Sequence, residues 1–184
     1  MNYKNIIFDL GNVLVKLDED ATMRAFEKLG MGSFKHLREN PEALQLFQAM
    51  GNATDKQITD ATNAMLLIIP DVKKQKLIDL RKAGYHTFLL SNTIDIHWRY
   101  CKDKLFPMGN YTADDYFDRI FTSQEMHMKK PDDEIFQTVI KEACINPNET
   151  IFIDDLEVNC IAAEKNGIHA FQNKEFDDWM ELFS

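Results

Sequence analysis

Carboxylates directly follow two apolar segments of this chain, and this placement predicts a cation site. Asp9 directly follows the apolar run at 6–8. Asp154 and Asp155 directly follow the apolar run at 151–153. An apolar strand that stops on an acid places that acid at the carboxyl edge of a sheet, where open α/β sheets bind ligands. Three carboxylates at this edge would suit a hard divalent cation such as Mg²⁺. Asp9 is also a candidate nucleophile, because a carboxylate can attack phosphorus or carbon and then be released by water.

Each of these acids also has a structural interpretation. Asp9 alone would more often bond to nearby backbone N–H groups at a strand-to-turn junction. Asp154 and Asp155 could be solvated loop acids that cap the next helix. Adjacent acids repel each other, however, unless a cation or a set of donors offsets them. Metal binding becomes the better interpretation when Asp9 is considered with them, and Asn159 could then orient one carboxylate.

Two further segments carry groups that suit a phosphate. Ser91 and Asn92 directly follow an apolar run, and a hydroxyl with backbone N–H groups at a strand end can hold a phosphate oxygen. Ser-Asn is also a common turn pair. Lys130 could pair with the first acid and neutralise a phosphate, although Lys129 beside it is an alternative. We favour Lys130 because Pro131 restricts its backbone.

The elements that must position these residues alternate between strand and helix. This alternation predicts an α/β fold, a Rossmann-like parallel sheet with helices on both faces, in a core domain of residues 1–17 and 71–184. The expected strands are 6–9, 87–90, 119–122, 150–153 and 168–171, and the expected helices are 72–82, 132–143, 157–165 and 176–183.

Residues 18–70 are expected to form a small helical cap inserted after the first strand. The segment is too long for a simple crossover between parallel strands. We expect it to be helical to about residue 69, ending before Pro70, with helix starts at Asp18, Asn40-Pro41 and Thr54. Two helical patterns join abruptly around Met50-Gly51-Asn52, which suggests that residues are missing there.

Composition limits the partners. The 184 residues carry a formal net charge of -9, which argues against nucleic acid and anionic membranes and requires a local cation for any phosphorylated ligand. Three widely spaced cysteines indicate reduced thiols and a cytoplasmic protein, and neither a signal peptide nor a membrane span is apparent. We expect a small phosphorylated metabolite as the partner, and a monomer or weak homodimer.

Taken together, four segments in this order resemble the motifs of the haloacid dehalogenase-like (HAD) hydrolase superfamily. They are residues 8–13, 90–93, 130–131 and 152–155, and the resemblance spans nearly the whole chain. It is closest to bacterial phosphatase-like members with a small helical cap, some of which act on sugar phosphates. The resemblance therefore implies a Rossmann-like core, hydrolase activity and Mg²⁺ as cofactor.

The resemblance also implies a role for each matching residue. Asp9 would be the nucleophile and a Mg²⁺ ligand, together with the backbone carbonyl of Gly11. Asp155 would be a further ligand, and Asp154 would bind directly or through water. Ser91 and Asn92 would hold the phosphate, with Gly11 and Asn12 as further phosphate contacts, and Lys130 would stabilise the charge around it.

Gly11 is a departure from most phosphatases of this superfamily, which carry a second Asp at this position as general acid/base. Protonation of the leaving alcohol typically contributes about 10²–10⁴-fold, so the enzyme should be slow or limited to good leaving groups unless a residue such as Asp18 substitutes. A resembling subgroup shares the Asp-Leu-Gly-Asn pattern, so activity is still expected.

The leading functional hypothesis is a Mg²⁺-dependent phosphomonoester hydrolase that forms an aspartyl-phosphate on Asp9. The first alternative is carbon–halogen hydrolysis by the same nucleophile, which needs no protonated leaving group but also no metal. The second is a phosphometabolite-binding protein whose catalysis is weakened at Gly11.

Overall fold

The computed structural model describes residues 3–30, 51 and 53–183, and the chain divides into two compact units. The core unit comprises the described residues up to Lys16 and from Ile68 onward, and the helical unit is Leu17–Leu67. The sequence predicts a core of residues 1–17 and 71–184 and a cap of residues 18–70, so these bounds differ from those of the two units by one to three residues. Among the described residues no helix is long and apolar enough to cross a membrane.

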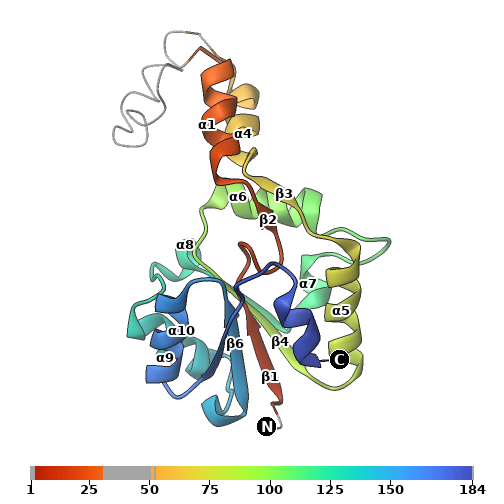
Figure 1. Cartoon of the computed structure of the whole chain (residues 1–184), viewed down its shortest axis with the longest axis vertical. Helices are drawn as coiled ribbons and strands as arrows, with labels where there is room; N and C mark the ends of the chain where they lie inside the picture. Colours follow the sequence, from red (N-terminus) through yellow and green to blue (C-terminus); the bar gives the residue numbers. More distant parts are fainter. Residues whose placement is uncertain (1–2, 31–50, 52, 184) are drawn as a thin grey trace. The chain divides into compact units, whose positions relative to one another are not determined.

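A five-stranded parallel sheet forms the centre of the core unit (Figure 1). Its strands are short apolar runs buried between helices, which is typical of parallel sheets. β1 lies in the middle, between β4 and β6, so it is hydrogen-bonded on both sides. This arrangement confirms the predicted fold class. In spatial order the strands are β5 (Arg119–Thr122), β4 (His86–Ser91), β1 (Asn5–Phe8), β6 (Thr150–Asp154) and β7 (His169–Gln172).

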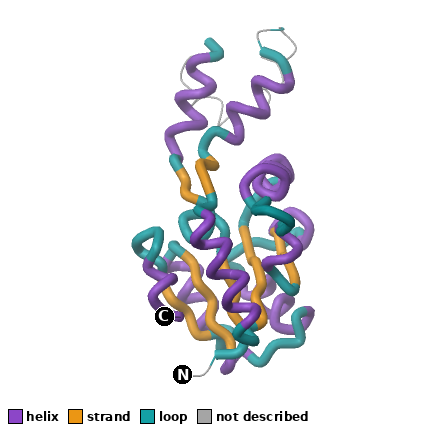
Figure 2. Tube along the Cα trace, turned by 90° about the vertical axis from the view of Figure 1, so that its right-hand side faces the viewer, coloured by secondary structure: helices purple, strands orange, loops and turns teal. Residues whose placement is uncertain are grey.

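Helices cover both faces of this sheet, as Figures 1 and 2 show. The longer ones are α5 (Asp71–Lys82), α9 (Asp133–Glu142) and α10 (Glu157–Lys165), close to their predicted bounds. The expected helix at 176–183 is instead a 3₁₀ helix over Asp178–Phe183. Sequence patterns did not predict the short elements: α6 (Asp95–Tyr100), a π-helix over Cys101–Leu105, α7 (Ala113–Tyr116), α8 (Ser123–Met126) and a 3₁₀ helix over Pro147–Glu149.

Successive side chains of β1 point to opposite faces of the sheet and pack into two separate layers of the core. Ile7 packs with Phe136 of α9 and Ala163 of α10 on one face. Phe8 points to the other face, where its ring lies 4.9 Å from that of Trp179 in an edge-on arrangement. Since successive strand residues face opposite sides, the strand that carries Asp9 is anchored in both layers.

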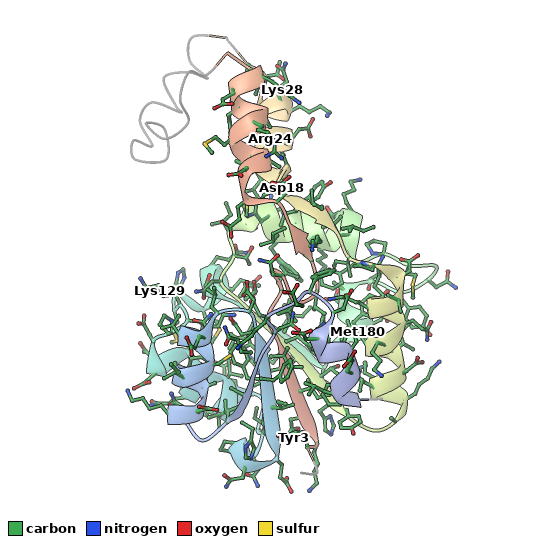
Figure 3. All side chains as sticks on the ribbon, viewed as in Figure 1. Tyr3, Asp18, Arg24, Lys28, Lys129 and Met180 are labelled. Atoms are coloured by element: carbon green, nitrogen blue, oxygen red, sulfur yellow. The ribbon has the colours of Figure 1, made fainter. Side chains whose placement is uncertain are left out.

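The helical unit is built on α1 (Glu19–Lys28) and α4 (Asp55–Asn63), both labelled in Figure 1. The two helices pack through Phe26, Ile58 and Ala61. Thr54 begins α4 with a capping box, as its position predicted. Asp18 begins α1, but its carboxylate pairs with Arg24 at 2.5 Å instead of capping the helix (Figure 3).

The prediction that this segment is helical to about residue 69 is wrong. α4 ends at Asn63, and Leu66–Ile68 form strand β3, which pairs with β2 (Lys16–Leu17). A short apolar run carries no periodicity that separates strand from helix, and here the pairing partner decides. The helix expected from Asn40-Pro41 lies outside the described residues, as does most of the junction where we suspected missing residues.

Candidate active site

The two central strands bring the predicted acids together at the carboxyl edge of the sheet. β1 and β6 are parallel neighbours with Phe8 opposite Ile153, and the Asp9 N–H donates to the Ile153 carbonyl at 2.9 Å. Asp9, Asp154 and Asp155 each offer a carboxylate oxygen, and these oxygens lie within 4.8 Å of one another. Such a cluster of oxygens fits Mg²⁺, a hard cation that binds oxygen ligands, carboxylates among them.

Lys130 lies between two of these acids. Its Nζ donates to Asp9 Oδ1 and Asp154 Oδ2, at 2.7 Å each, and to the Leu90 carbonyl at 2.9 Å. The residue is only 3% exposed, whereas Lys129 is exposed at the surface (Figure 3). The expected pairing of Lys130 with Asp9 is therefore present, and Lys129 does not make it.

Asn92 holds Lys130 in place through the backbone. Its side-chain amide donates to the Lys130 carbonyl at 2.8 Å and accepts from the Lys130 N–H at 2.9 Å. Both ends of the Asn92 side chain are thus engaged. Ser91 ends β4 beside it and is buried, and its hydroxyl has no hydrogen-bond partner in the part of the chain that the structure describes.

Asp154 is held by several donors. Asn159 Nδ2 lies 3.0 Å from each of its carboxylate oxygens, and the Leu156 N–H donates to Oδ1 at 2.8 Å. With Lys130 added, this fully buried carboxylate has a fixed orientation. The expectation that Asn159 orients one of the two acids agrees with this geometry.

The loop after β1 reaches Asp155. Asn12 adopts a left-handed backbone conformation with φ 50°, which Asn tolerates better than most residues. Its side-chain amide donates to Asp155 Oδ2 at 3.2 Å, and its N–H donates to the Val15 carbonyl at 2.8 Å. Asn12 therefore contacts a carboxylate of the cluster, and Gly11 lies between it and the Asp9 strand end.

Burial and mutual repulsion shift the protonation of the cluster. Burial raises the pKa of Asp9 to about 6, with Asp154 adding to the rise and Lys130 opposing it. Burial also raises the pKa of Asp155. Burial opposes the charge of Lys130, but the charges of Asp9 and Asp154 outweigh it and its pKa is raised. Three carboxylates against one ammonium leave excess negative charge, which a divalent cation would neutralise.

Three residues near this site had no predicted role. Asn173 donates to the Asn12 carbonyl at 2.9 Å, and Trp179 Nε1 and Lys73 Nζ donate to the Val13 carbonyl at 3.0 and 2.6 Å. Trp179 was readable only as a core aromatic. Lys73 lies in a polar helix, where a lysine is usually solvated, and Asn173 follows a strand, where an asparagine is usually a turn residue. The sequence therefore did not indicate a role for either residue.

Comparison with known proteins agrees with this site. The family model for haloacid dehalogenase-like hydrolases matches residues 3–167, so the chain belongs to this family of hydrolases. The D-ribitol-5-phosphate phosphatase of Bacteroides thetaiotaomicron is 31% identical in an alignment that covers 97% of this chain and 95% of that protein. The chain is thus an enzyme of the HAD phosphatase type, and the superfamily predicted from the four motifs is confirmed.

Solved structures extend the agreement to the cofactor. A HAD family enzyme from B. thetaiotaomicron in complex with magnesium and inorganic phosphate has a TM-score of 0.87 and 37% identity, with 100% of both chains covered. A HAD-like hydrolase from Porphyromonas gingivalis has a TM-score of 0.83 and 29% identity, covering 100% of this chain and 97% of that one. A dehalogenase at 21% identity and a TM-score of 0.59 shares the fold. Magnesium, predicted from the acids, is the cofactor that these findings support.

Proposed function

We propose that this protein is a Mg²⁺-dependent phosphomonoester hydrolase that acts on a small sugar or sugar-alcohol phosphate through an aspartyl-phosphate. The observation that carries the proposal is the convergence of Asp9, Lys130, Asp154 and Asp155 at one edge of the sheet. Likeness to a D-ribitol-5-phosphate phosphatase supports the substrate class. The partner would then be a small phosphorylated metabolite.

In the proposed first step Asp9 attacks the phosphoryl group. A bond forms between its carboxylate oxygen and phosphorus while the ester P–O bond breaks, and the leaving alkoxide takes up a proton from water. Lys130 fixes one Asp9 oxygen at 2.7 Å, which leaves the other as the attacking atom in our proposal. Preorganised charge of this kind lowers the barrier because it needs no rearrangement during the reaction.

In the second step water attacks phosphorus and the Asp9–phosphorus linkage breaks. Inorganic phosphate leaves, the water proton is lost, and the Asp9 carboxylate is restored. Bound Mg²⁺ would offset charge on the phosphoryl oxygens, and Asp9, Asp154, Asp155 and the Gly11 carbonyl are its proposed ligands. Ser91 would contribute its hydroxyl to the phosphate, while the Asn92 side chain binds the backbone of Lys130. Asn12 would approach the phosphate through its backbone, since its amide already contacts Asp155.

The loop after β1 offers no proton donor for the leaving group at position 11. Gly11 has no side chain to protonate the leaving group, so rates should depend strongly on the leaving alcohol. Asp18, the substitute considered from the sequence, belongs to the helical unit, and among the described residues its carboxylate pairs with Arg24 of the same unit. The dehalogenase alternative is disfavoured because Asp154 and Asp155 would repel a haloacid anion.

The test is phosphate release from D-ribitol 5-phosphate, other sugar phosphates and p-nitrophenyl phosphate, with and without Mg²⁺. Asp9→Asn should abolish turnover, because the amide is a poor nucleophile. Asp133→Asn is the control and should keep turnover, because this acid of α9 forms a solvent-exposed ion pair with Lys165 and is not part of the acidic cluster. Full activity in Asp9→Asn would refute the mechanism, and turnover that persists in chelator would refute the metal dependence.

A further inference from the structure

Asn173 bridges the two loops that carry the acidic cluster. It directly follows the edge strand β7 and is only 1% exposed. Its side-chain amide donates to the Asn12 carbonyl at 2.9 Å, and its backbone N–H donates to the Asp154 carbonyl at 2.8 Å. One residue thus ties the loop after β1 to the end of β6.

The next link leads to a carboxylate. Asn12, whose carbonyl accepts from Asn173, donates its own side-chain amide to Asp155 Oδ2 at 3.2 Å. The Asn173 amide therefore fixes the peptide of a residue that in turn orients an acid of the cluster. Asn12 occupies the small left-handed region of backbone conformation, and the hydrogen bond from Asn173 adds to the contact that its N–H makes with the Val15 carbonyl.

The segment after Asn173 reinforces the same loop. The Trp179 N–H donates to Asn173 Oδ1 at 3.0 Å, which fixes the orientation of the amide, and its indole Nε1 donates to the Val13 carbonyl at 3.0 Å. Lys73 Nζ donates to the same carbonyl at 2.6 Å. Two successive carbonyls of the site loop thus accept hydrogen bonds from buried side chains distant in the sequence.

We propose that Asn173 is a positioning residue for the Mg²⁺ site, which sets the placement of Asp155 relative to Asp9 through the peptide of Asn12. The inference rests on the proposed assignment of these acids as metal ligands. Groups that orient metal ligands typically affect metal affinity or activity by about 10–100-fold, because the ligand must otherwise be ordered when the metal binds. The amide is well suited to this role, since it donates to the Asn12 carbonyl while it accepts from Trp179.

The test compares Mg²⁺ binding to the wild type, Asn173→Ala and Asn5→Ala by isothermal titration calorimetry. Asn5, at the start of β1, is a control of the same residue type, because it is also buried, at 6% exposure, and donates a side-chain hydrogen bond to Thr150 Oγ1 at 3.1 Å. The Asn173 side chain makes more such bonds, since it also donates to the Phe176 carbonyl at 3.4 Å. Both variants should unfold at a lower temperature. Only Asn173→Ala should bind Mg²⁺ more weakly, by about 10–100-fold.

A kinetic measurement separates positioning from general damage. In Asn173→Ala the half-saturating Mg²⁺ concentration for phosphate release should rise, and excess Mg²⁺ should restore much of kcat. If this variant does not fold, Asn173→Ser, whose hydroxyl is too short to replace the amide, is measured instead. Wild-type Mg²⁺ affinity in the folded variant would overturn the inference while the proposed function stands. A wild type that binds no Mg²⁺ would overturn the metal site and the inference with it.

Discussion

Replacement of Lys130 by methionine should destabilise the metal-free protein strongly. The side chain is 1% exposed, and its Nζ contacts carboxylate oxygens of Asp9 and Asp154 at 2.7 Å each. Removal of one partner of a buried ion pair costs about 3–5 kcal/mol, because the remaining charge stays buried and unpaired. For a chain of 184 residues, at roughly 2–4 °C per kcal/mol, the unfolding temperature should fall by about 6–20 °C.

The assay is thermal and urea unfolding in EDTA at pH 8, above the pKa of about 6 that burial gives Asp9. Lys4→Met is the matched control. Lys4 Nζ lies the same 2.7 Å from Glu149 Oε1, but the two side chains are 62% and 36% exposed. Exposed pairs of this kind contribute no more than about 1 kcal/mol, so the control should change little.

Mg²⁺ should then restore part of the stability lost in Lys130→Met, because a bound cation neutralises the carboxylates that the lysine had paired. A Lys130→Met variant no less stable than Lys4→Met would refute the reasoning, since it would mean that the buried acids carry no unpaired charge. Loss of stability without any recovery in Mg²⁺ would place the cation away from Asp9 and Asp154.

Chelation should lower the unfolding temperature of the wild type by roughly 5–11 °C, because free Mg²⁺ at 100 times its Kd contributes about 2.7 kcal/mol; a chelator-insensitive Tm would contradict the metal site. Asn159→Ala removes both amide contacts to Asp154 and should lower kcat/KM for phosphate release by about 10–100-fold, whereas unchanged kinetics would show that the other donors suffice. Burial lowers the pKa of Lys73 to about 8 from its ordinary 10.5, with Asp177 opposing the shift, so the folded protein loses this proton before the unfolded chain does. Urea unfolding should therefore show the stability of the wild type rising relative to Lys73→Met between pH 8 and 10.5, by about 1–2 kcal/mol after allowance for solvent screening, and a constant difference would contradict this.

The acidic cluster was predictable because its geometry follows from local pattern and one topological rule. Asp9 and Asp154 each end an apolar strand, and parallel strands share their carboxyl edge, so two distant acids could be placed together without knowledge of the packing. The pairing of Lys130 with Asp9 followed from charge. The strands were readable as short apolar runs that alternate with helical segments, and α9 was readable from its apolar stripe.

The errors and omissions share a different cause, which is dependence on partners far along the chain. Leu66–Ile68 form a strand because Lys16–Leu17 pair with them, and nothing in the local run indicates this. Lys73 is buried, and its Nζ donates a hydrogen bond to the Val13 carbonyl, 60 residues away in the sequence. Asn173 acts on Asn12 across 161 residues. Local sequence cannot reveal such contacts when the residue types are ordinary for a helix surface or a turn.

The bridge between Asn173 and Asn12 has a consequence for the order in which a growing chain gains activity. The ribosome adds about 5–20 residues per second, so the 161 residues between these partners take roughly 8–32 s. During that interval the nascent chain already carries Asp9 on its first strand, while the groups that hold the adjacent loop have not been made. Cation binding and phosphate release should therefore arise late in synthesis, after Asn173 and Trp179 have emerged and reached the loop.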